Sequence, residues 1–407
     1  MKNLILSLII LSAFFSVNAQ RQMEKLDRGL VAVKTDEGVF LSWRILATEM
    51  NNTAFNIYRD NQKIAFISAS EASNYIDKDG HQTSVYTIKP VVNNNELNES
   101  QTAVPLNNNY IEIALKQHEG YTPGDASAGD LTGDGKYEIV IHQTGRGRDN
   151  SHPGFTDEPI LQAYTISGKL LWEINLGKNI REGAHYIQFM VYDLDGDGIA
   201  EIACKTAPGT TDGSGSFLNL GPAATDDDMA DYRSVGGRID GRILSGPEYL
   251  TIFDGKTGKE LATTYYIPAR LDGTTAYNQQ KLKETWGDNY GNRSDRFLAC
   301  IAYLDGMRPS LVMARGYYTR TVLAAWNWRN GELSHLWTFD SNTPGNEAYI
   351  GQGNHNLAVG DVDNDSFDEI IYGACAIDHN GEGLYSTNLG HGDAGHLSDF
   401  DPDRPGL

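Results

Sequence analysis

Short apolar runs, each bounded by Gly, Asn or Asp, recur along most of the chain, and helical periodicity is scarce. Residues 39–43 and 85–89 alternate apolar and polar positions, which is typical of strands with one buried face. Continuous apolar runs such as Ile202-Ala203-Cys204 follow acidic turns and are typical of strands buried on both faces. The pattern therefore predicts an all-β protein.

The N-terminal part, residues 20–106, is predicted to fold as a β-sandwich. Four strands are expected, at residues 39–43, 55–59, 63–66 and 85–89. Asp60 and Asn61 supply a turn, and Pro90 is expected at the end of the last strand or at an edge position. A Trp and a late Tyr inside these strands resemble a fibronectin type III or immunoglobulin-like module without its disulfide. The Asn-rich stretch from Asn93 to Asn109 is expected to mark the boundary of this domain.

A compound repeat runs through the second predicted domain, residues 107–407. Its first half is an acidic loop followed by a strand, and its second half is two strands joined by a Gly turn. Acidic loops begin at Asp130, Asp193 and Asp361, whereas the third unit has lost its acids. Units too small to bury a sheet alone favour a β-propeller of about 4 to 8 blades over a β-helix. A fifth loop begins at Asp399, where the sequence stops, which predicts an incomplete propeller.

The second loop, from Asp193 to Glu201, is the clearest copy of a calcium-binding pattern. Carboxylates at positions one, three and five can converge on one hard cation if the backbone turns sharply, and Gly198 permits that turn. A single copy would indicate only an acidic surface turn, but three full copies favour calcium. The candidate ligands are Asp130, Asp134 and Glu138 in the first loop, Asp193, Asp195, Asp197 and Glu201 in the second, and Asp361, Asp363, Asp365 and Glu369 in the fourth.

Two of these loops depart from the pattern. Thr132 replaces an acid in the first loop, where Asp125, just upstream, could supply the missing ligand. In the fourth loop Ser366 replaces the usual Gly, which is expected to strain the turn without removing the oxygen ligands.

Two histidines, His355 and His391, lie close in sequence to the fourth loop and have Gly neighbours. They could be metal ligands, substrate donors or a general base, although a single His is most often only a hydrogen-bonded polar residue. Two insertions, residues 205–245 and 263–295, could each form a wall of a binding cleft or a surface loop. Nucleophile elbows, phosphate loops and Cys-based zinc spacings are missing from the sequence.

The first 19 residues have the charge, apolar run and small-residue exit of a secretory signal peptide. No later apolar run approaches the ~20 residues that span a bilayer, so a secreted or periplasmic monomer without a membrane span is expected. The net charge of −21 argues against nucleic acid as a partner. Bound metals and Arg side chains could nevertheless reverse the potential inside one cleft and bind an acidic polysaccharide. The three cysteines have apolar or small neighbours and are expected to be buried free thiols.

Six motifs closely resemble the family 11 rhamnogalacturonan lyases, and the resemblance extends from about Leu26 to Leu407. They are Asp130-Leu131-Thr132-Gly133-Asp134-Gly135, residues 189–198, Trp286-Gly287-Asp288, residues 351–356, Tyr385-Ser386-Thr387 and His391-Gly392-Asp393-Ala394. The resemblance implies an eight-bladed propeller with several Ca²⁺ ions that cleaves the rhamnose–galacturonate backbone of rhamnogalacturonan I, a pectin of the plant cell wall, by β-elimination. It also implies one calcium cluster near the cleft, made by His355, His391, Asp393, Asp361, Asp363 and Asp365.

Elimination needs a base for the proton at C5 of galacturonate and a cation at its carboxylate. The catalytic base and the substrate-binding residues stay unassigned at this point. Two segments differ from the family: Gly124-Asp125-Ala126-Ser127 replaces the usual Asn-Asp-Ala-Ser, and His142-Gln143-Thr144 replaces the usual Lys-Trp-Asp. The alternative function is a non-catalytic, calcium-stabilised propeller that binds pectic polysaccharide or protein.

Overall fold

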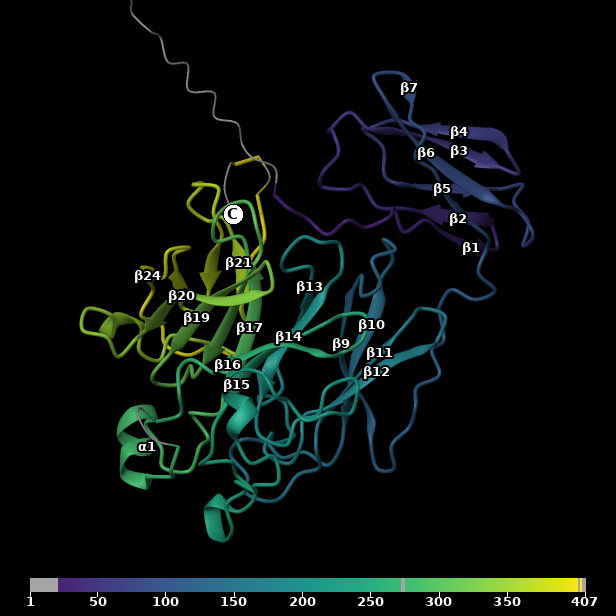
Figure 1. Ribbon diagram of the computed structural model, residues 1–407. Coiled ribbons are helices and arrows are strands. Elements are labelled where there is room, and N and C mark those ends of the chain that lie inside the picture. Colours follow the sequence, from purple (N-terminus) through teal and green to yellow (C-terminus); the bar gives the residue numbers. More distant parts are fainter. Residues whose placement is uncertain (1–20, 272–274, 402, 405–407) are drawn as a thin grey trace, which may run out of the picture.

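The computed structural model describes residues 21–271, 275–401 and 403–404, and antiparallel β-sheets make up most of it (Figure 1). The predicted signal peptide, residues 1–19, lies outside the described residues. Within the described ranges, no helix is long and apolar enough to cross a membrane. An all-β protein was predicted; the described residues are mostly β, with one α-helix that the prediction did not include.

The N-terminal part consists of two antiparallel sheets that enclose one core. Its strands are β1 (Val31–Thr35), β2 (Gly38–Ser42), β3 (Ala54–Arg59), β4 (Gln62–Ile67), β5 (Asn74–Asp77), β6 (Tyr86–Val92), β7 (Asn95–Glu96) and β8 (Gln101–Ala103). One sheet has the order β1-β2-β5; the other has the order β4-β3-β6-β7, and β8 also pairs with β6. Trp43, Phe55 and Tyr86 are buried between the two sheets.

Turn chemistry explains one hairpin of this domain, and two expectations need correction. Asp60 and Asn61 have φ values of 50° and 67°, the left-handed backbone of the tight β3–β4 turn that these residues predicted. Pro90 does not end β6, which continues to Val92; it lies between the stretch that pairs with β8 and the stretch that pairs with β7. The stretch from Asn93 to Asn109 is not a simple boundary, because it contains β7 and β8.

Four successive four-stranded sheets follow, and each is an up-and-down meander. The first contains β9 (Thr122–Gly129), β10 (Glu138–Thr144), β11 (Ile160–Tyr164) and β12 (Leu170–Asn175). The second contains β13 (Phe189–Tyr192), β14 (Glu201–Thr206), β15 (Tyr249–Phe253) and β16 (Glu260–Tyr265). The third contains β17 (Phe297–Ala302), β18 (Ser310–Arg315), β19 (Val322–Arg329) and β20 (Glu332–Asp340). The fourth contains β21 (Ala358–Gly360), β22 (Glu369–Ile371), β23 (Cys375–Ile377) and β24 (Gly383–Ser386).

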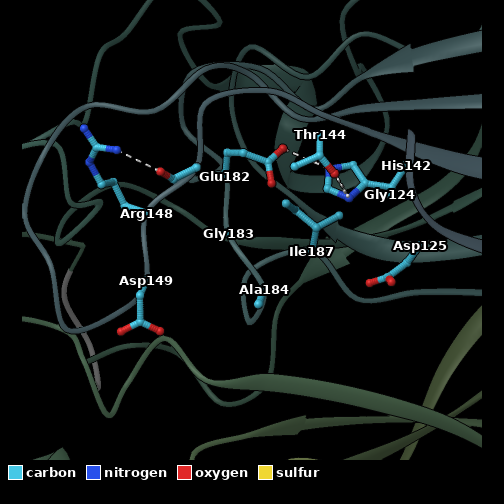
Figure 2. A pocket seen from close by; sticks show the side chains of 11 residues that line it. Gly124, Asp125, His142, Thr144, Arg148, Asp149, Glu182, Gly183, Ala184 and Ile187 are labelled. Carbon is cyan, nitrogen blue, oxygen red and sulfur yellow. Dashed lines mark hydrogen bonds and ion pairs between the residues drawn. The ribbon is translucent and has the colours of Figure 1, made fainter. Parts of the chain in front are cut away.

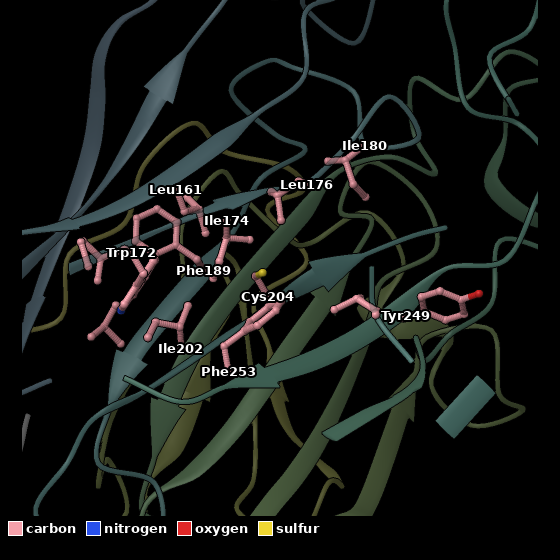
Figure 3. Close-up of a cluster of buried hydrophobic side chains, with 14 of the residues drawn as sticks. Leu161, Trp172, Ile174, Leu176, Ile180, Phe189, Ile202, Cys204, Tyr249 and Phe253 are labelled. Carbon is pink, nitrogen blue, oxygen red and sulfur yellow. The ribbon is translucent and has the colours of Figure 1, made fainter. Parts of the chain in front are cut away.

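The first strands of successive sheets are neighbours, since β9 lies beside β13, β13 beside β17 and β17 beside β21. Apolar side chains fill the space between the sheets. Figure 3 shows the cluster between the first and second sheets, which includes Trp172, Ile202 and Phe253. The indole N–H of Trp172 also donates to the Gly255 carbonyl at 2.7 Å, which ties the two sheets together. All three cysteines are buried and free, as predicted.

A meander places its connections at two opposite ends of each sheet. The turn between the first two strands and the hairpin between the last two lie at one end, which we call the loop end; it carries the acidic loops. The connection between the second and third strands, and the connection to the next sheet, lie at the other end, which we call the return end. Because β14 runs to Thr206 and β16 to Tyr265, both predicted insertions begin slightly later than expected, and both belong to the return end.

The insertions pack against the sheets. The second contains the helix α1 (Gln279–Trp286), whose Leu282 and Trp286 are buried with Leu244 and Val322. The Asn278 side chain accepts a hydrogen bond from the first turn, and Gly287, in the left-handed conformation, ends the helix. An eight-residue helix is too short for its periodicity to stand out, which is why the sequence did not predict it.

Candidate functional site

A pocket with a volume of about 390 Å³ opens at the return end of the first sheet. It is lined by Gly124, Asp125, His142, Thr144, Gly147, Arg148, Asp149, Glu182, Gly183, Ala184 and Ile187. Figure 2 shows Asp125 and Asp149 at opposite ends of this group, with Ile187 between them. Carboxylates, an imidazole and a hydroxyl beside an apolar side chain suit a sugar ring, which has hydroxyl edges and an apolar face.

His142 and Glu182 form a buried pair in the wall of this pocket. The Nε2 atom of His142 lies 2.9 Å from a carboxylate oxygen of Glu182, and the two side chains are 8% and 1% exposed. The neighbouring Gly124 is fixed by close packing, because a Cβ there would lie 2.3 Å from the Thr144 hydroxyl. The two segments that differ from the family pattern therefore meet in space, and a side chain at position 124 is incompatible with Thr144 as it stands.

A cluster of aromatic and imidazole rings lies next to the pocket, beyond Asp149. Tyr317 stacks on His391 with ring centroids 5.3 Å apart, and His355 lies 5.0 Å from His391. His185 lies 5.3 Å from His355. The Arg296 guanidinium lies 5.8 Å from the centroid of the Tyr317 ring. His185 precedes β13, Arg296 precedes β17 and Tyr317 follows β18, while His355 precedes β21 and His391 follows β24. The second, third and fourth sheets therefore contribute to one cluster.

Charges in this cluster are coupled. Burial lowers the pKa of His185 to about 4, and the positive charges of Arg296 and His355 add to the shift. Burial also lowers the pKa of His355. The pKa of Asp149 falls to about 2: burial opposes this shift, but hydrogen bonds from Ser151 and the charge of Arg296 outweigh it. At neutral pH, this region therefore combines unprotonated imidazoles with an ionised carboxylate and a buried guanidinium.

His355, His391 and Asp393 each offer one ligand atom, and these atoms lie within 4.8 Å of one another. The Nδ1 atom of His391 lies 2.6 Å from the Gly353 carbonyl, and its buried Nε2 has no hydrogen-bond partner within the described residues. Asp361, Asp363 and Asp365 form a different group. The expectation of one cluster made by all six residues is therefore wrong, because β21 separates the return-end group from the loop-end group.

The second acidic loop has the geometry of a cation site. Ligand atoms of Asp193, Asp195 and Asp197 lie within 4.8 Å of one another. Asp193 accepts hydrogen bonds from the backbone N–H groups of Gly196 and Gly198, which wraps the loop around its carboxylate. Burial and the three neighbouring Asp carboxylates raise the pKa of Glu201 to about 8. A divalent cation would relieve this concentration of negative charge.

The first loop is less complete. Asp130 accepts four backbone hydrogen bonds from residues 132–135, while Asp134 lies 3.7 Å from the Lys136 ammonium. Asp125 lies at the opposite end of β9, in the pocket, about 16 Å of strand away from Asp130. The expectation that Asp125 completes this loop is therefore wrong.

The fourth and third loops differ in how they handle charge. In the fourth, Ser366 has a φ of 78°, the left-handed conformation expected from its replacement of Gly, and Asp361, Asp363 and Asp365 converge. Burial raises the pKa of Glu369, the last acid of this loop, to about 7. In the third loop Asp305 pairs with Arg308 at 2.8 Å, so an arginine side chain takes the place of a metal ion.

The N-terminal segment 21–27 crosses the loop end. At least one polar contact reaches each loop: Asp27 to Gly135, Lys25 to Gly196, Gln22 to Met307 and Arg21 to Asp368. Glu24 lies between the first two loops, and burial together with Asp193 raises the pKa of its carboxyl to about 7. The loops between the first two strands of all four sheets are thus contacted by one stretch of chain.

Several residues of the site were not predicted from the sequence to be functional. They are His142, Glu182, His185, Arg296, Tyr317 and Tyr318 at the return end, and Asp378 and His379 at the loop end. Their partners are far away in sequence, and they do not belong to a repeated motif. The change from Lys-Trp-Asp to His142-Gln143-Thr144 was the one signal that pointed to the pocket wall.

These features define a β-sheet protein with a polar, histidine-rich return end and with acidic loops suited to divalent cations. The model "Rhamnogalacturonan I lyases beta-sheet domain" matches residues 21–106, and "Rhamnogalacturonan lyase family 11, C-terminal domain" matches residues 103–407. The chain belongs to rhamnogalacturonan lyase family 11.

Two curated relatives from Bacillus subtilis (strain 168) are similar over nearly the whole chain. Rhamnogalacturonan exolyase YesX is 54% identical over 399 residues, which cover 95% of this chain and 62% of the relative. Rhamnogalacturonan endolyase YesW is 52% identical over 400 residues, which cover 96% of this chain and 61% of the relative. The chain thus spans less than two thirds of the length of either relative.

Solved structures agree with this assignment. The crystal structure of the exotype lyase YesX matches with a TM-score of 0.87 at 53% identity, over 95% of this chain and 63% of that one. The crystal structure of YesW matches with a TM-score of 0.85 at 52% identity, over 95% of this chain and 65% of that one. A rhamnogalacturonan lyase from Bacillus licheniformis matches with a TM-score of 0.85, also at 52% identity, over the same shares of the two chains.

Proposed function

We propose that this protein is a calcium-dependent rhamnogalacturonan lyase, which cleaves the rhamnose–galacturonate backbone of rhamnogalacturonan I by β-elimination. Membership of family 11 carries the proposal, because the relatives YesX and YesW are named as an exolyase and an endolyase of rhamnogalacturonan. The return end supports it with a pocket suited to sugar and an adjacent guanidinium. Its setting would be outside the cytoplasm, where an exported monomer meets plant cell-wall polysaccharide.

We infer that the four meanders are consecutive blades of a β-propeller spanning residues 107–407. The side-by-side first strands of successive sheets support this arrangement. Residues 20–106 are proposed as a fibronectin- or immunoglobulin-like sandwich domain. The two family models, which meet near residues 103–106, support the same division.

Calcium is the cation we propose for the acidic loops, because carboxylate and carbonyl oxygens are its preferred ligands. The proposed ligands at the loop end are Asp130, Asp134, Glu138, Asp193, Asp195, Asp197, Glu201, Asp361, Asp363, Asp365 and Glu369. At the return end, His355, His391 and Asp393 are proposed to hold an ion, with Asp125 as a further ligand near the substrate. A cation bound there would supply positive charge for the galacturonate carboxylate.

Two residues of the chain are proposed to act on the galacturonate unit. Arg296 is held by Asn292, with one N–H donating to the Asn292 side-chain oxygen at 2.7 Å, and its guanidinium can bind the carboxylate. His185 makes no side-chain hydrogen bond within the described residues, so its imidazole is available for the C5 proton. When the C5–H bond breaks, its electron pair forms the C4–C5 double bond, and the C4 oxygen leaves with the rest of the chain.

The test is to incubate the purified protein with rhamnogalacturonan I and Ca²⁺ and to follow the ultraviolet absorbance of the new C4–C5 double bond. Absorbance is expected to rise with rhamnogalacturonan I and not with homogalacturonan of the same chain length. If neither this chain nor one extended to the relatives' full length produces unsaturated product while both bind the polysaccharide, the protein is a non-catalytic pectin-binding propeller instead.

A further inference from the structure

Another pocket, with a volume of about 230 Å³, lies in the N-terminal sandwich where the chain enters it, and we call it the sandwich pocket. Its walls come from the entering segment, from the connection between β2 and β3, and from the start of β8 with the residues before it. A water takes up about 30 Å³ of liquid, so the pocket has room for far more than one water. It is lined by Leu26, Asp27, Arg28, Leu46, Glu99, Ser100 and Gln101, and it shares none of these residues with the pocket at the return end.

A largely buried ion pair holds the walls of the sandwich pocket in place. Arg28 donates two hydrogen bonds to Glu49, at 2.8 and 2.5 Å, and the two side chains are 7% and 12% exposed. Glu49 also accepts the Leu46 N–H at 2.9 Å, which ties the β2–β3 connection to the entering segment. Burial opposes ionisation of Glu49, but the hydrogen bonds from Arg28 and Leu46 hold its pKa below the usual range. The charge of Arg28 is therefore balanced within the wall, which disfavours an anionic ligand.

Gln101 offers a hydrogen-bond acceptor that the chain leaves unused. Its side-chain N–H donates to a carboxylate oxygen of Asp27 at 2.6 Å, which fixes the orientation of the amide group. Asp27 is fixed in turn, because its other carboxylate oxygen accepts the Gly29 N–H at 2.7 Å. The Oε1 atom of Gln101 is buried and has no hydrogen-bond partner within the described residues. A buried acceptor without a donor lowers stability, and a ligand hydroxyl would supply the missing donor.

The other lining side chains favour an uncharged ligand rich in hydroxyl groups. The side chain of Glu99 is 73% exposed, which places it at the mouth of the pocket, and Ser100 adds a hydroxyl. Carboxylate and amide oxygens only accept hydrogen bonds, so Glu99 and Gln101 require a ligand that donates. Leu26 and Leu46 are apolar and can pack against C–H groups. A sugar ring combines hydroxyl donors with apolar C–H groups, whereas a hydrated cation would gain nothing from the two leucines.

We propose that the sandwich pocket binds one uncharged sugar unit, at the end or at a branch of a polysaccharide chain. Glu99 and Gln101 accept hydrogen bonds from its hydroxyls, and Leu26 and Leu46 contact its C–H groups. A sugar site on the N-terminal domain would raise the effective concentration of polysaccharide at the return end, because both sites belong to one chain. This inference goes beyond the lyase activity proposed above, and its test needs no turnover.

The test is a titration of the full chain in Ca²⁺ with methyl glycosides, followed by saturation-transfer difference NMR, which detects weak binding from the signals of the sugar. Two probes are uncharged, methyl α-L-rhamnoside and methyl β-D-galactoside, and one is anionic, methyl α-D-galacturonoside. At least one uncharged probe is expected to bind to the sandwich pocket. The anionic probe is expected to bind with the same affinity whether or not the sandwich pocket is intact.

L46W fills the pocket and should abolish this binding of the uncharged probe. Q101L removes the acceptor but keeps a side chain of similar size, and it should weaken binding about 2- to 10-fold, the usual net value of one hydrogen bond. L97W and Q62L are the matched controls, at exposed positions of the same domain, and should bind like the wild type. Thermal midpoints check that the variants are folded. The proposal is overturned if neither uncharged probe binds, or if L46W and Q101L bind the uncharged probe as tightly as their controls.

Discussion

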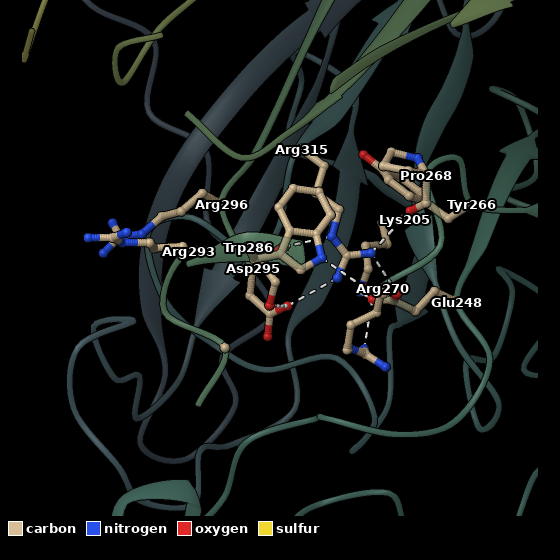
Figure 4. A network of polar contacts seen from close by, with 12 residues as sticks. Lys205, Glu248, Tyr266, Pro268, Arg270, Trp286, Arg293, Asp295, Arg296 and Arg315 are labelled. Carbon is tan, nitrogen blue, oxygen red and sulfur yellow. Dashed lines mark hydrogen bonds and ion pairs between the residues drawn. The ribbon is translucent and has the colours of Figure 1, made fainter. Parts of the chain in front are cut away.

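Glu248 at the return end and Glu369 at the loop end are both buried carboxylates, but their electrostatic surroundings are opposite. Glu248 accepts a hydrogen bond from Arg315 at 2.7 Å and pairs with Arg270 at 2.8 Å and Lys205 at 3.3 Å (Figure 4). Burial opposes ionisation of Glu248, yet these cations hold its pKa far below the usual range. Burial and the neighbouring Asp carboxylates instead raise the pKa of Glu369 to about 7.

Glu248 and Glu369 represent two ways in which a β protein can keep a charged group in its interior. The return end neutralises its buried carboxylate with three basic side chains, so its charge balance is built into the sequence. Within the described residues, the buried carboxylates Glu201 and Glu369 of the acidic loops pair with no lysine or arginine, and we infer that they depend on an ion from the solvent. The third loop neutralises its carboxylate in the same way as the return end, but with a single basic side chain: Arg308 pairs with Asp305.

The largest effect on stability is expected from R315M. This substitution removes the central cation and leaves Glu248 and Asp295 buried with fewer partners, which should cost about 3–5 kcal/mol of unfolding free energy. Urea denaturation in Ca²⁺ measures the loss. R308M is the matched control: its pair is half exposed, and about 1 kcal/mol or less should be lost. Equal losses of unfolding free energy in R315M and R308M would contradict the claim that basic side chains neutralise Glu248 at the return end.

H185Q tests the chemistry proposed for the return end. Removing a general base should lower kcat by about 10²- to 10⁴-fold, with little change in the thermal midpoint or in calcium binding. H152Q, at an exposed histidine on the same face, is the control and should keep wild-type kcat. An H185Q protein with unchanged kcat would exclude His185 as the base and would leave the cleavage reaction itself untouched.

E201Q is expected to change the free energy of unfolding in opposite directions with and without Ca²⁺. In chelator at pH 8 the substitution removes a repelled carboxylate and should stabilise the protein, on the order of 1–3 kcal/mol. In Ca²⁺ it removes a ligand and should destabilise the protein by a similar amount. Urea denaturation with and without Ca²⁺ measures both values, with E332Q, an exposed acid on β20, as the control. The same sign under both conditions would argue against an ion in this loop.

Sequence patterns predicted the structural features that involve only residues close together in the chain. The spacing of Asp193, Asp195 and Asp197 identified an acidic loop, and the Gly turns identified the hairpins, because each signal lies within a few residues. The strand β9 was missed, since its segment Thr122–Gly129 has no apolar alternation. The return end was largely missed because its partners are distant: His142 and Glu182 are 40 residues apart, and Glu248 and Arg315 are 67 residues apart.

Asp125 shows why proximity in sequence does not establish proximity in space. Its proximity in sequence suggested that it completes the first loop, but a strand carries consecutive segments to opposite ends of a sheet. The same geometry separates His355 from Asp361. Residue types and spacing therefore identified which groups could bind metal, while the topology decided which of them meet.

The most direct test of this account is the thermal midpoint between pH 6.5 and pH 8, with chelator and with Ca²⁺. Without metal, Glu201 and Glu369 have folded-state pKa values of about 8 and about 7, above the unfolded value of 4.5. The folded state then binds more protons, so stability should fall as pH rises, by up to about 1.4 kcal/mol per pH unit for each carboxyl. His185, whose pKa is lowered from 6.5 to about 4, adds a slope of the opposite sign that is at most about half as large at pH 6.5 and fades as pH rises towards 8.

The midpoint in chelator is expected to decrease between pH 6.5 and pH 8; Ca²⁺ should abolish the decrease, and E201Q should reduce it. A midpoint in chelator that stays level or rises over this range, and that Ca²⁺ does not change, would contradict the claim that the loop end depends on an ion from the solvent.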